Sequence, residues 1–305
     1  NFDLIGVINT QGAGGTIAKY ANIASMKSSG IELTISSKNM RTKDFSWNTD
    51  FIFSKTKNEI TDLKSHANVL SLISGNGFGR EGYPVRGLFS IPFAGLTEDG
   101  LPTFINQDGQ KTISSFNFQE YEKLDFLKYE GPTDPTITGS FGNILTYKNL
   151  KLNVFVTYSF GNVIRLDPVF SNAYSDLDAM PKEFKNRWMK AGDENVTNIP
   201  TIVSTRMNQQ YAYLNMAYNA YNYSDVRIAD GGFIRLKEIS LSYDLPAKVI
   251  NFFRLNKLQL KLQATNLCLL YADSKLNGQD PEFFRSGGVS TPVPKQFTFT
   301  VRLGL

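Results

Sequence analysis

The feature that most constrains this chain is a two-residue alternation of apolar and polar side chains. It is clearest in the last eleven residues, KQFTFTVRLGL, where Phe297, Phe299, Val301, Leu303 and Leu305 share one parity and polar or small residues fill the other. A period of two is that of a β-strand, whose successive side chains point to opposite faces of a sheet. Residues 295–305 are therefore predicted to form a strand with one apolar and one polar face.

The same alternation recurs along the chain. We expect strands over residues 31–37, 45–55, 137–148, 150–160, 232–245 and 257–265, with 4–9 as a further candidate. Within 232–245 the apolar residues change parity, which one inserted bulge residue near Glu238 explains.

Composition excludes several classes of protein. The chain has 305 residues and is 41% hydrophobic, which is typical of a folded protein, and its net charge of +4 is too small to indicate a nucleic-acid partner. One cysteine, Cys268, and one histidine, His66, are too few for a Cys/His metal cluster. We therefore expect no catalytic residues, no cofactor, no metal site and no nucleic-acid partner.

The connections between the expected strands alternate in length. Short joins follow residues 37, 147 and 244, and the long ones cover about 57–136, 161–231 and 267–295. Compact soluble domains rarely contain structureless connections longer than ~15 residues. Outer-membrane barrels combine tight periplasmic turns with long outer loops. The sequence thus predicts an all-β fold, a transmembrane antiparallel β-barrel, with the three long segments as extracellular loops.

In such a barrel the apolar parity faces lipid and the polar parity faces a lumen. A Lys or Arg on the lipid face costs about 2–4 kcal/mol near the bilayer midplane, so the parity that carries Lys151, Lys261 and Arg302 is assigned to the inside. The lumen-facing candidates are Asn48, Asp50, Asn153, Gln259, Lys261, Gln263 and Arg302. Alternation alone does not separate this fold from a soluble sandwich, in which the apolar face would point into a packed core.

Seven stretches carry a resemblance to a known family. They are NIASMKSSGIELTIS, GYPVRGLFSIPFAGLTEDGLPTF, YEGPTDPTITGSFGNILTYKNLKLNVFVTYSFGN, NRWMKAGDENVTNIP, GGFIRLKEISLSYDLP, QATNL with QDPE after it, and PVPKQFTFTVRLGL. Together they resemble the C-terminal part of the SusC/RagA family, the TonB-dependent outer-membrane transporters of Bacteroidetes. The match runs in order from about Asn22 to the last residue.

The resemblance implies that this chain is the C-terminal portion of a 22-stranded barrel, either as a fragment or as one chain of a split barrel. Only seven or eight strands are recognisable, and the chain opens on Asn1 rather than Met, so we expect the plug and the TonB box to lie outside it. An independent eight-stranded barrel is the alternative.

The resemblance also implies a function, which is TonB-dependent import of a large nutrient, an oligosaccharide or a peptide, across the outer membrane. The implied partners are a SusD-like surface lipoprotein, TonB, the remainder of the barrel and outer-membrane lipid. Within this function the chain supplies part of the barrel wall and of the outer vestibule. A barrel-based surface scaffold or adhesin, and a soluble glycan-binding β-sandwich, remain as alternatives.

A tyrosine-rich run, QQYAYLNMAYNAYNYSD, offers candidate contacts to a substrate or a partner on an outer loop. Its members are Tyr211, Tyr213, Tyr218, Tyr221 and Tyr223. Phenol rings stack well on sugars and peptides, but they also pack loops and form aromatic girdles, and the sequence does not separate these roles.

Two carboxylate pairs are candidates for hydrolysis or calcium binding. Asp193 with Glu194 and Asp280 with Glu282 lie beside Gly or Pro, and no Asp-x-Asp-x-Asp pattern accompanies either pair. We expect them to form turns. The segment 181–192 is predicted to be a short amphipathic helix, opened by its proline and closed by its glycine.

Overall fold

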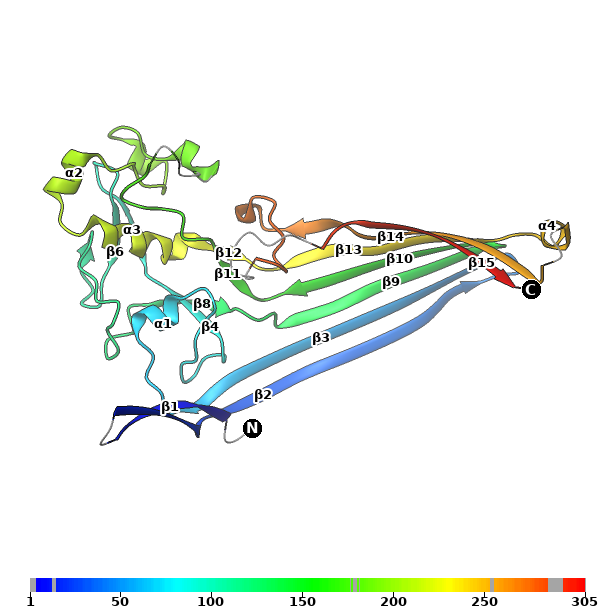
Figure 1. The fold of residues 1–305 in the computed structure, drawn as a ribbon, viewed down its shortest axis with the longest axis horizontal. Coiled ribbons are helices and arrows are strands. Elements are labelled where there is room, and N and C mark those ends of the chain that lie inside the picture. The colour runs from blue at the N-terminus through cyan, green and yellow to red at the C-terminus, as the bar shows by residue number, and fades with distance from the viewer. Residues whose placement is uncertain are drawn as a thin grey trace. The chain divides into compact units, whose positions relative to one another are not determined.

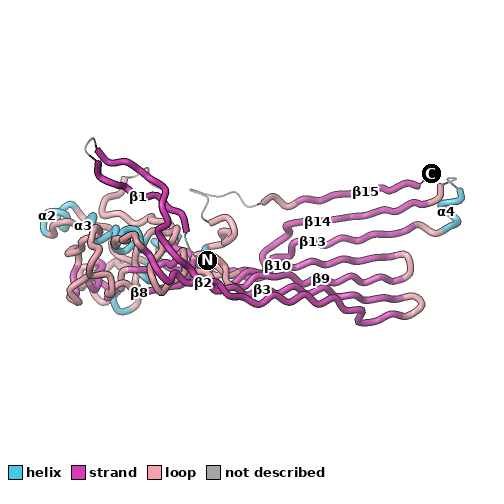
Figure 2. Tube along the Cα trace, turned by 90° about the horizontal axis from the view of Figure 1, so that it is seen from below, coloured by secondary structure: helices cyan, strands magenta, loops and turns pink. Residues whose placement is uncertain are grey.

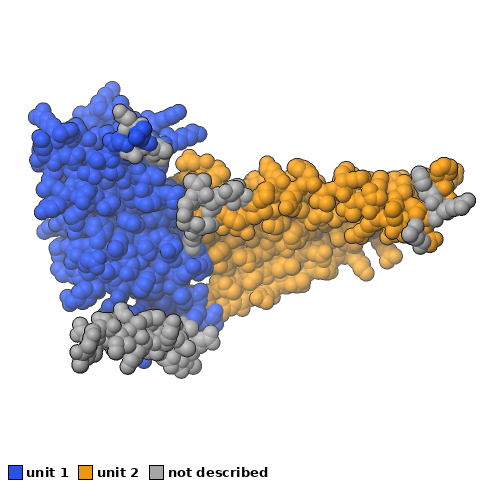
Figure 3. All heavy atoms as spheres, viewed as in Figure 1, with its two compact units in different colours: residues 1–28, 58–134, 163–229 blue, residues 29–57, 135–162, 230–305 orange. Residues whose placement is uncertain are grey.

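The computed structural model describes residues 4–12, 15–175, 177, 180, 182–252, 255–284 and 293–304, with side chains from residue 23 onward. The chain divides into two compact units, which Figure 3 colours separately. Unit 1 comprises residues 1–28, 58–134 and 163–229, and unit 2 comprises 29–57, 135–162 and 230–305. The sequence did not indicate this division, because the packed unit is assembled from segments expected to be loops.

Eight strands form one antiparallel sheet in the order β1-β2-β3-β9-β10-β13-β14-β15 (Figures 1 and 2). They are β1 (Leu4–Gly12), β2 (Gly15–Arg41), β3 (Phe45–Leu63), β9 (Ile137–Tyr147), β10 (Leu150–Phe160), β13 (Phe233–Asp244), β14 (Lys257–Ala272) and β15 (Gln296–Gly304). Every strand expected from the alternation is present, including the candidate near the start. Leu305 lies outside the described residues.

This topology removes two of the alternatives. The eight strands form a single sheet rather than two facing sheets, so the soluble β-sandwich is wrong. Among the described residues β1 pairs only with β2 and β15 only with β14, so these strands do not close into a barrel of their own.

The bulge expected near Glu238 is present in β13. Phe155 pairs with Glu238 and Val156 pairs with Leu236, which leaves Lys237 without an opposite residue on β10. The register between β13 and β14 shifts at the same place. The bulge therefore keeps the apolar residues on both sides of it on one face of the sheet, although their parity changes.

From β2 onward, short and long connections alternate along the sheet. Residues 42–44, 148–149 and 245–256 make the short ones, and the last holds α4 (Ala247–Phe252). Because neighbouring strands are antiparallel, the long connections leave the sheet at its other end. β3 and β14 run farther than predicted, to Leu63 and Ala272, because backbone pairing continues after the alternation has ended.

The long connections contain many short elements. They are α1 (Val69–Ile73), β4 (Gly87–Ser90), β5 (Phe93–Leu96), β6 (Pro102–Ile105), β7 (Lys111–Thr112), β8 (Lys128–Pro132), β11 (Val163–Arg165), α2 (Thr205–Gln210), α3 (Leu214–Asn222), β12 (Ile228–Asp230) and the 3-10 turns η1 (Lys182–Asn186), η2 (Asp193–Asn195), η3 (Asp225–Arg227) and η4 (Ser274–Leu276). The helix expected over 181–192 is only the single turn η1. Among the residues that the structure describes, no helix is long and apolar enough to cross a membrane.

An aromatic core holds unit 1 together. Phe89, Phe104 and Tyr218 are fully buried, and the ring of Phe104 meets that of Phe116 edge-on with centroids 5.4 Å apart. Tyr218 also donates a hydrogen bond to the carbonyl of Thr201. Burial of several large rings explains why connections of this length are folded, since each ring removes a large apolar area from water.

In unit 2 a tyrosine packs across a glycine. Tyr158 on β10 lies opposite Gly139 on β9 and donates a hydrogen bond to the carbonyl of Ile52 on β3 at 2.9 Å. A Cβ atom on Gly139 would overlap both that carbonyl oxygen and the phenol group. By contrast, a Cβ atom on Gly142 of the same strand would meet its nearest neighbour, Phe155, at 3.4 Å.

Gly139→Ala is therefore expected to destabilise the folded protein by about 1–3 kcal/mol, the usual cost of overpacking. Gly142→Ala is the matched control and is expected to change stability by less than about 1 kcal/mol. Urea unfolding of the full-length protein in lipid vesicles measures both. Equal stability of the two variants would show that Tyr158 does not close over Gly139.

Phe89→Ala is expected to lower the free energy of unfolding of unit 1 by about 3–5 kcal/mol, because it leaves a cavity at a fully buried aromatic site. Limited proteolysis should then cut residues 64–134 faster while the strands of unit 2 stay protected. Tyr213→Ala, at a side chain that is 70% exposed, is the control and should leave the cleavage rate unchanged. If the strands of unit 2 lost their protection from protease together with the loops, unit 1 would not have a separate core.

Candidate functional site

The seven residues predicted to face a lumen lie on one face of the sheet, which we call the polar face. Residues that pair directly across antiparallel strands point to the same side. One row from β3 to β15 consists of Asn48, Ile144, Asn153, Ser240, Gln263 and Thr298. The other four predicted residues occupy neighbouring rows on the same side, namely Asp50, Gln259, Lys261 and Arg302. That this side faces a lumen stays a prediction.

Hydrogen bonds connect the side chains of the polar face. Glu238 accepts a hydrogen bond from Nδ2 of Asn153 at 3.2 Å and lies 3.9 Å from Nζ of Lys261. Gln259 donates to Asp244 at 3.0 Å. Sequence reasoning missed the place of Glu238 in this network, although the change of parity at the bulge was the signal that could have found it.

The opposite side of the sheet, which we call the apolar face, carries no charge over its central rows. One row consists of Trp47, Leu145, Leu152, Leu241, Leu262 and Phe299. In the rows from Phe45 to Phe53 no paired position on this side carries a charged side chain. Lys55 is the first charged residue beyond these rows. Leu262 and Phe299 are 59% and 62% exposed, so nothing in the described chain covers this face.

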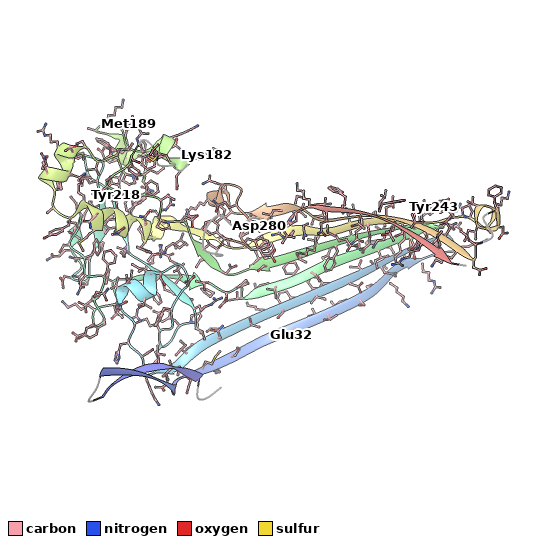
Figure 4. The ribbon with its side chains drawn as sticks, in the orientation of Figure 1. Glu32, Lys182, Met189, Tyr218, Tyr243 and Asp280 are labelled. Carbon is pink, nitrogen blue, oxygen red and sulfur yellow. The ribbon has the colours of Figure 1, made fainter. Side chains whose placement is uncertain are left out.

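A buried arginine connects β13 to the segment after β14. The guanidinium of Arg235 donates to both carboxylate oxygens of Asp280 at 2.6 and 2.7 Å and lies 3.0 Å from Glu282. Asp280 is labelled in Figure 4. The two carboxylates thus share one cation. Because both ends of the Arg235–Asp280 bridge are more than nine-tenths buried, removing either would leave an unpaired buried charge.

Asp193 and Glu194 have the turn-forming role that the sequence predicted. The carboxylate of Asp193 accepts the backbone N–H groups of Met189 and Lys190, at 3.0 and 3.1 Å. Glu194 accepts from the indole of Trp188, which holds the pKa of that carboxyl below its usual value. Across the described part of the chain, no group of three or more His, Cys, Asp or Glu side chains is placed to hold a metal ion.

The tyrosine run divides into buried and exposed rings. Tyr218 and Tyr221 are in the core of unit 1, where burial raises the pKa of each phenol (Figure 4 labels Tyr218). Tyr211 donates to Asp99 at 2.8 Å, and Tyr223 lies against the guanidinium of Arg165. Tyr213 is the most exposed of the five. In this arrangement the buried rings pack the loops, and surface contact is left mainly to Tyr213.

Unit 1 also buries charged groups. Arg165 donates hydrogen bonds to the carbonyl of Phe89 at 2.6 Å, to Oγ of Ser90 at 2.9 Å and to the carbonyl of Ser224 at 3.1 Å. Burial lowers the pKa of its guanidinium to about 10, so it is still protonated at neutral pH. Burial also raises the pKa of Glu130, on the neighbouring strand β8. These bonds make Arg165 a structural cation that ties separate segments together.

Comparison with known proteins gives a consistent result. No family model matches the chain. It is 25% identical over 291 residues to TonB-dependent receptor P3 of Formosa agariphila, covering 88% of this chain and 26% of that protein. It is 25% identical over 303 residues to TonB-dependent receptor SusC of Bacteroides thetaiotaomicron, covering 93% of this chain and 27% of that protein.

The fold is also shared. A chain in the structure of the RagAB peptide transporter matches with a TM-score of 0.72 at 22% identity, covering 99% of this chain and 32% of that one. This chain therefore spans less than a third of the length of the proteins it matches. Sequence and fold together confirm the resemblance to the SusC/RagA-type TonB-dependent transporters and the antiparallel barrel portion that it implied.

Proposed function

We propose that this chain forms part of the wall and outer vestibule of a TonB-dependent outer-membrane transporter that imports a large nutrient, an oligosaccharide or a peptide. The observation that carries the proposal is the sheet with two unlike faces, one exposed and uncharged over its central rows, the other polar and hydrogen-bonded. The relatives support it, because they are named TonB-dependent receptors and a peptide transporter.

The dimensions of the apolar face suit a membrane. β9 and β10 have 11 residues each, and a tilted transmembrane strand needs about 9–11. The uncharged rows begin at Phe45, where Tyr147 and Tyr243 also lie, and they end before Lys55. Aromatic rings at a boundary of the apolar band are typical of the girdles at membrane interfaces. Lipid is therefore the environment that this face requires.

The edges of the sheet indicate further strands. β15 pairs only with β14 among the described residues, so the backbone groups along its other side have no strand to pair with there. In hydrocarbon each unpaired group costs several kcal/mol, which excludes an open edge. We infer that the remainder of a large barrel supplies the missing neighbours, and that the plug and the TonB box belong to that remainder.

The proposed transport function implies two protein partners. RagAB peptide importers are known in "open-open" and "closed-closed" states. We infer by analogy that a SusD-like surface lipoprotein covers the loops of this barrel, that TonB acts on it from the periplasm, and that the loops are extracellular. The exposed Tyr213 is our candidate contact on that side. We infer no catalytic step.

Import is tested in the source organism with a panel of fluorescent oligosaccharides and peptides. Deleting the gene should abolish accumulation of at least one probe. Deleting tonB should abolish its accumulation but not its binding to the cell surface. Accumulation that is independent of TonB, or binding with no accumulation of any probe, would favour a scaffold or adhesin.

The orientation is tested by protease treatment of intact cells that lack the lid lipoprotein. Cleavage should occur within 64–136, 161–232 and 273–295 and should spare the turn at Lys148 and Asn149, because only the long connections lie outside in this topology. Permeabilised cells are the control, in which the turn also becomes accessible. Cleavage at the turn in intact cells would mean that the orientation is inverted.

A further inference from the structure

The segment that follows β14 folds back onto the sheet that it has just left. We call residues 273–284 the strap. β14 ends at Ala272, which pairs with Phe233, and Asp280 comes eight residues later. A fully extended chain of eight residues would reach about 27 Å beyond the sheet. Instead Asp280 contacts Arg235, the third residue of β13, so the strap returns to the strand next to β14.

The strap lies on the polar face of the sheet. Ile234 and Leu236, the neighbours of Arg235, are both in rows of the apolar face. Successive side chains of a strand point to opposite sides, so the guanidinium of Arg235 is on the polar face, in a row with Thr157 and Ser140. A segment that buries this guanidinium must therefore cover the polar face at that place.

The strap is at the end of the sheet where the long connections emerge. Figure 4 labels Asp280 at one end of the sheet and Tyr243, which lies beside the short turns, at the other. β13 begins at Phe233, so Arg235 is two residues from that end. All the groups that hold the strap belong to this chain. Its placement therefore does not depend on any further part of a barrel.

Hydrogen bonds and backbone conformation set the path of the strap. At its start, the carboxylate of Asp273 accepts the backbone N–H of Asp230 at 2.8 Å. The chain then reverses at Asn277 and Gly278, where φ is 52° and 84°. These are left-handed conformations, which asparagine and glycine adopt more easily than other residues. The reversal directs the rest of the strap back over the sheet.

A buried ion pair holds the returning half. The side chains of Arg235 and Asp280 are 6% and 8% exposed, and Glu282 adds a second carboxylate 3.0 Å from the guanidinium. A buried cation is costly without its partner, so the closed position of the strap is strongly favoured while the pair is intact. Arg235 thus acts as a positioning residue for the strap.

We propose that the strap is a fixed constriction of the outer mouth of the lumen and sets a size limit for the solutes that enter. Chain that packs on an inner wall adds a layer roughly 10 Å thick, the usual spacing of packed layers. A solute arriving from outside meets this layer before it reaches the rest of the polar face. The strap therefore admits slender, extended chains and excludes bulky solutes.

This inference rests on the proposed transport function, because it takes the polar face to line a lumen. The test labels a cysteine between the strap and the short turns, Gln263→Cys in a Cys268→Ala background of the full-length protein, purified in detergent without a lid lipoprotein. The probes are maleimides that carry polyethylene glycol chains of increasing length. Tyr213→Cys in the same background, at an exposed residue, gives the rate for each probe where no strap intervenes.

The test variant is Asp280→Asn with Glu282→Gln, which removes both charges that hold Arg235 and keeps the size of both side chains. The control is Asp125→Asn with Glu122→Gln, the same chemical change at two exposed residues of unit 1. Arg235→Lys is a second variant, which keeps the charge but not the two parallel hydrogen bonds to Asp280.

Rates are compared after division by the rate of the shortest probe. In wild type and control the longest probe should label position 263 at least about tenfold more slowly than position 213, because it reacts only when the strap opens locally. In the test variant this probe should label position 263 at least about tenfold faster than in wild type, because an unpaired buried guanidinium favours the open strap. The lysine variant should give an intermediate rate.

Two results would overturn the proposal. One is the same dependence on probe length at both positions in the wild type, and the other is a barrier that persists in both variants. Labelling by the shortest probe reports whether each variant is folded, and if the double variant is not, the lysine variant decides. The measurement needs neither TonB nor import, so a normal barrier in a protein that imports nothing would remove the transport function and leave the constriction.

Discussion

The fold of unit 2 depends on one constraint, which is that a strand in hydrocarbon must pair its backbone groups with its neighbours and turn only uncharged side chains outward. The sheet meets both conditions over its central rows. The bulge at Lys237 serves the second condition. It shifts the alternation of β13 by one residue, so that Leu236 and Ile239 both lie on the apolar face. Tyr158 over Gly139 fills that face at the loop end.

The loops obey a different rule, since they have water around them and must form their own core. Unit 1 does so with buried aromatic rings and with Arg165, which hydrogen-bonds to two backbone carbonyls and one serine hydroxyl. A buried cation is costly unless it is hydrogen-bonded, so these bonds favour one arrangement of the segments that they join. Loops folded in this way present a defined surface, on which Tyr213 is an exposed ring.

The strands and the division of their side chains between two faces of the sheet were predictable from sequence, because a period of two is visible in each segment. The packed loop unit was not predictable, since burial of Phe89 or Tyr218 depends on contacts between segments more than 100 residues apart. The tyrosine-rich run likewise shows that burial could not be predicted from sequence. Composition marked it as a contact site, but only the structure separates the rings that pack the core from the ring that is exposed.

The central claim is that the polar face looks into water and the apolar face into lipid. It is tested most directly by single cysteines at adjacent positions of β14, Leu262→Cys and Gln263→Cys, in a Cys268→Ala background of the full-length protein in outer-membrane vesicles. A small charged thiol reagent should label the cysteine at position 263 and leave that at position 262 unreacted, and a quencher dissolved in lipid should reach only position 262. The reverse pattern would contradict the account.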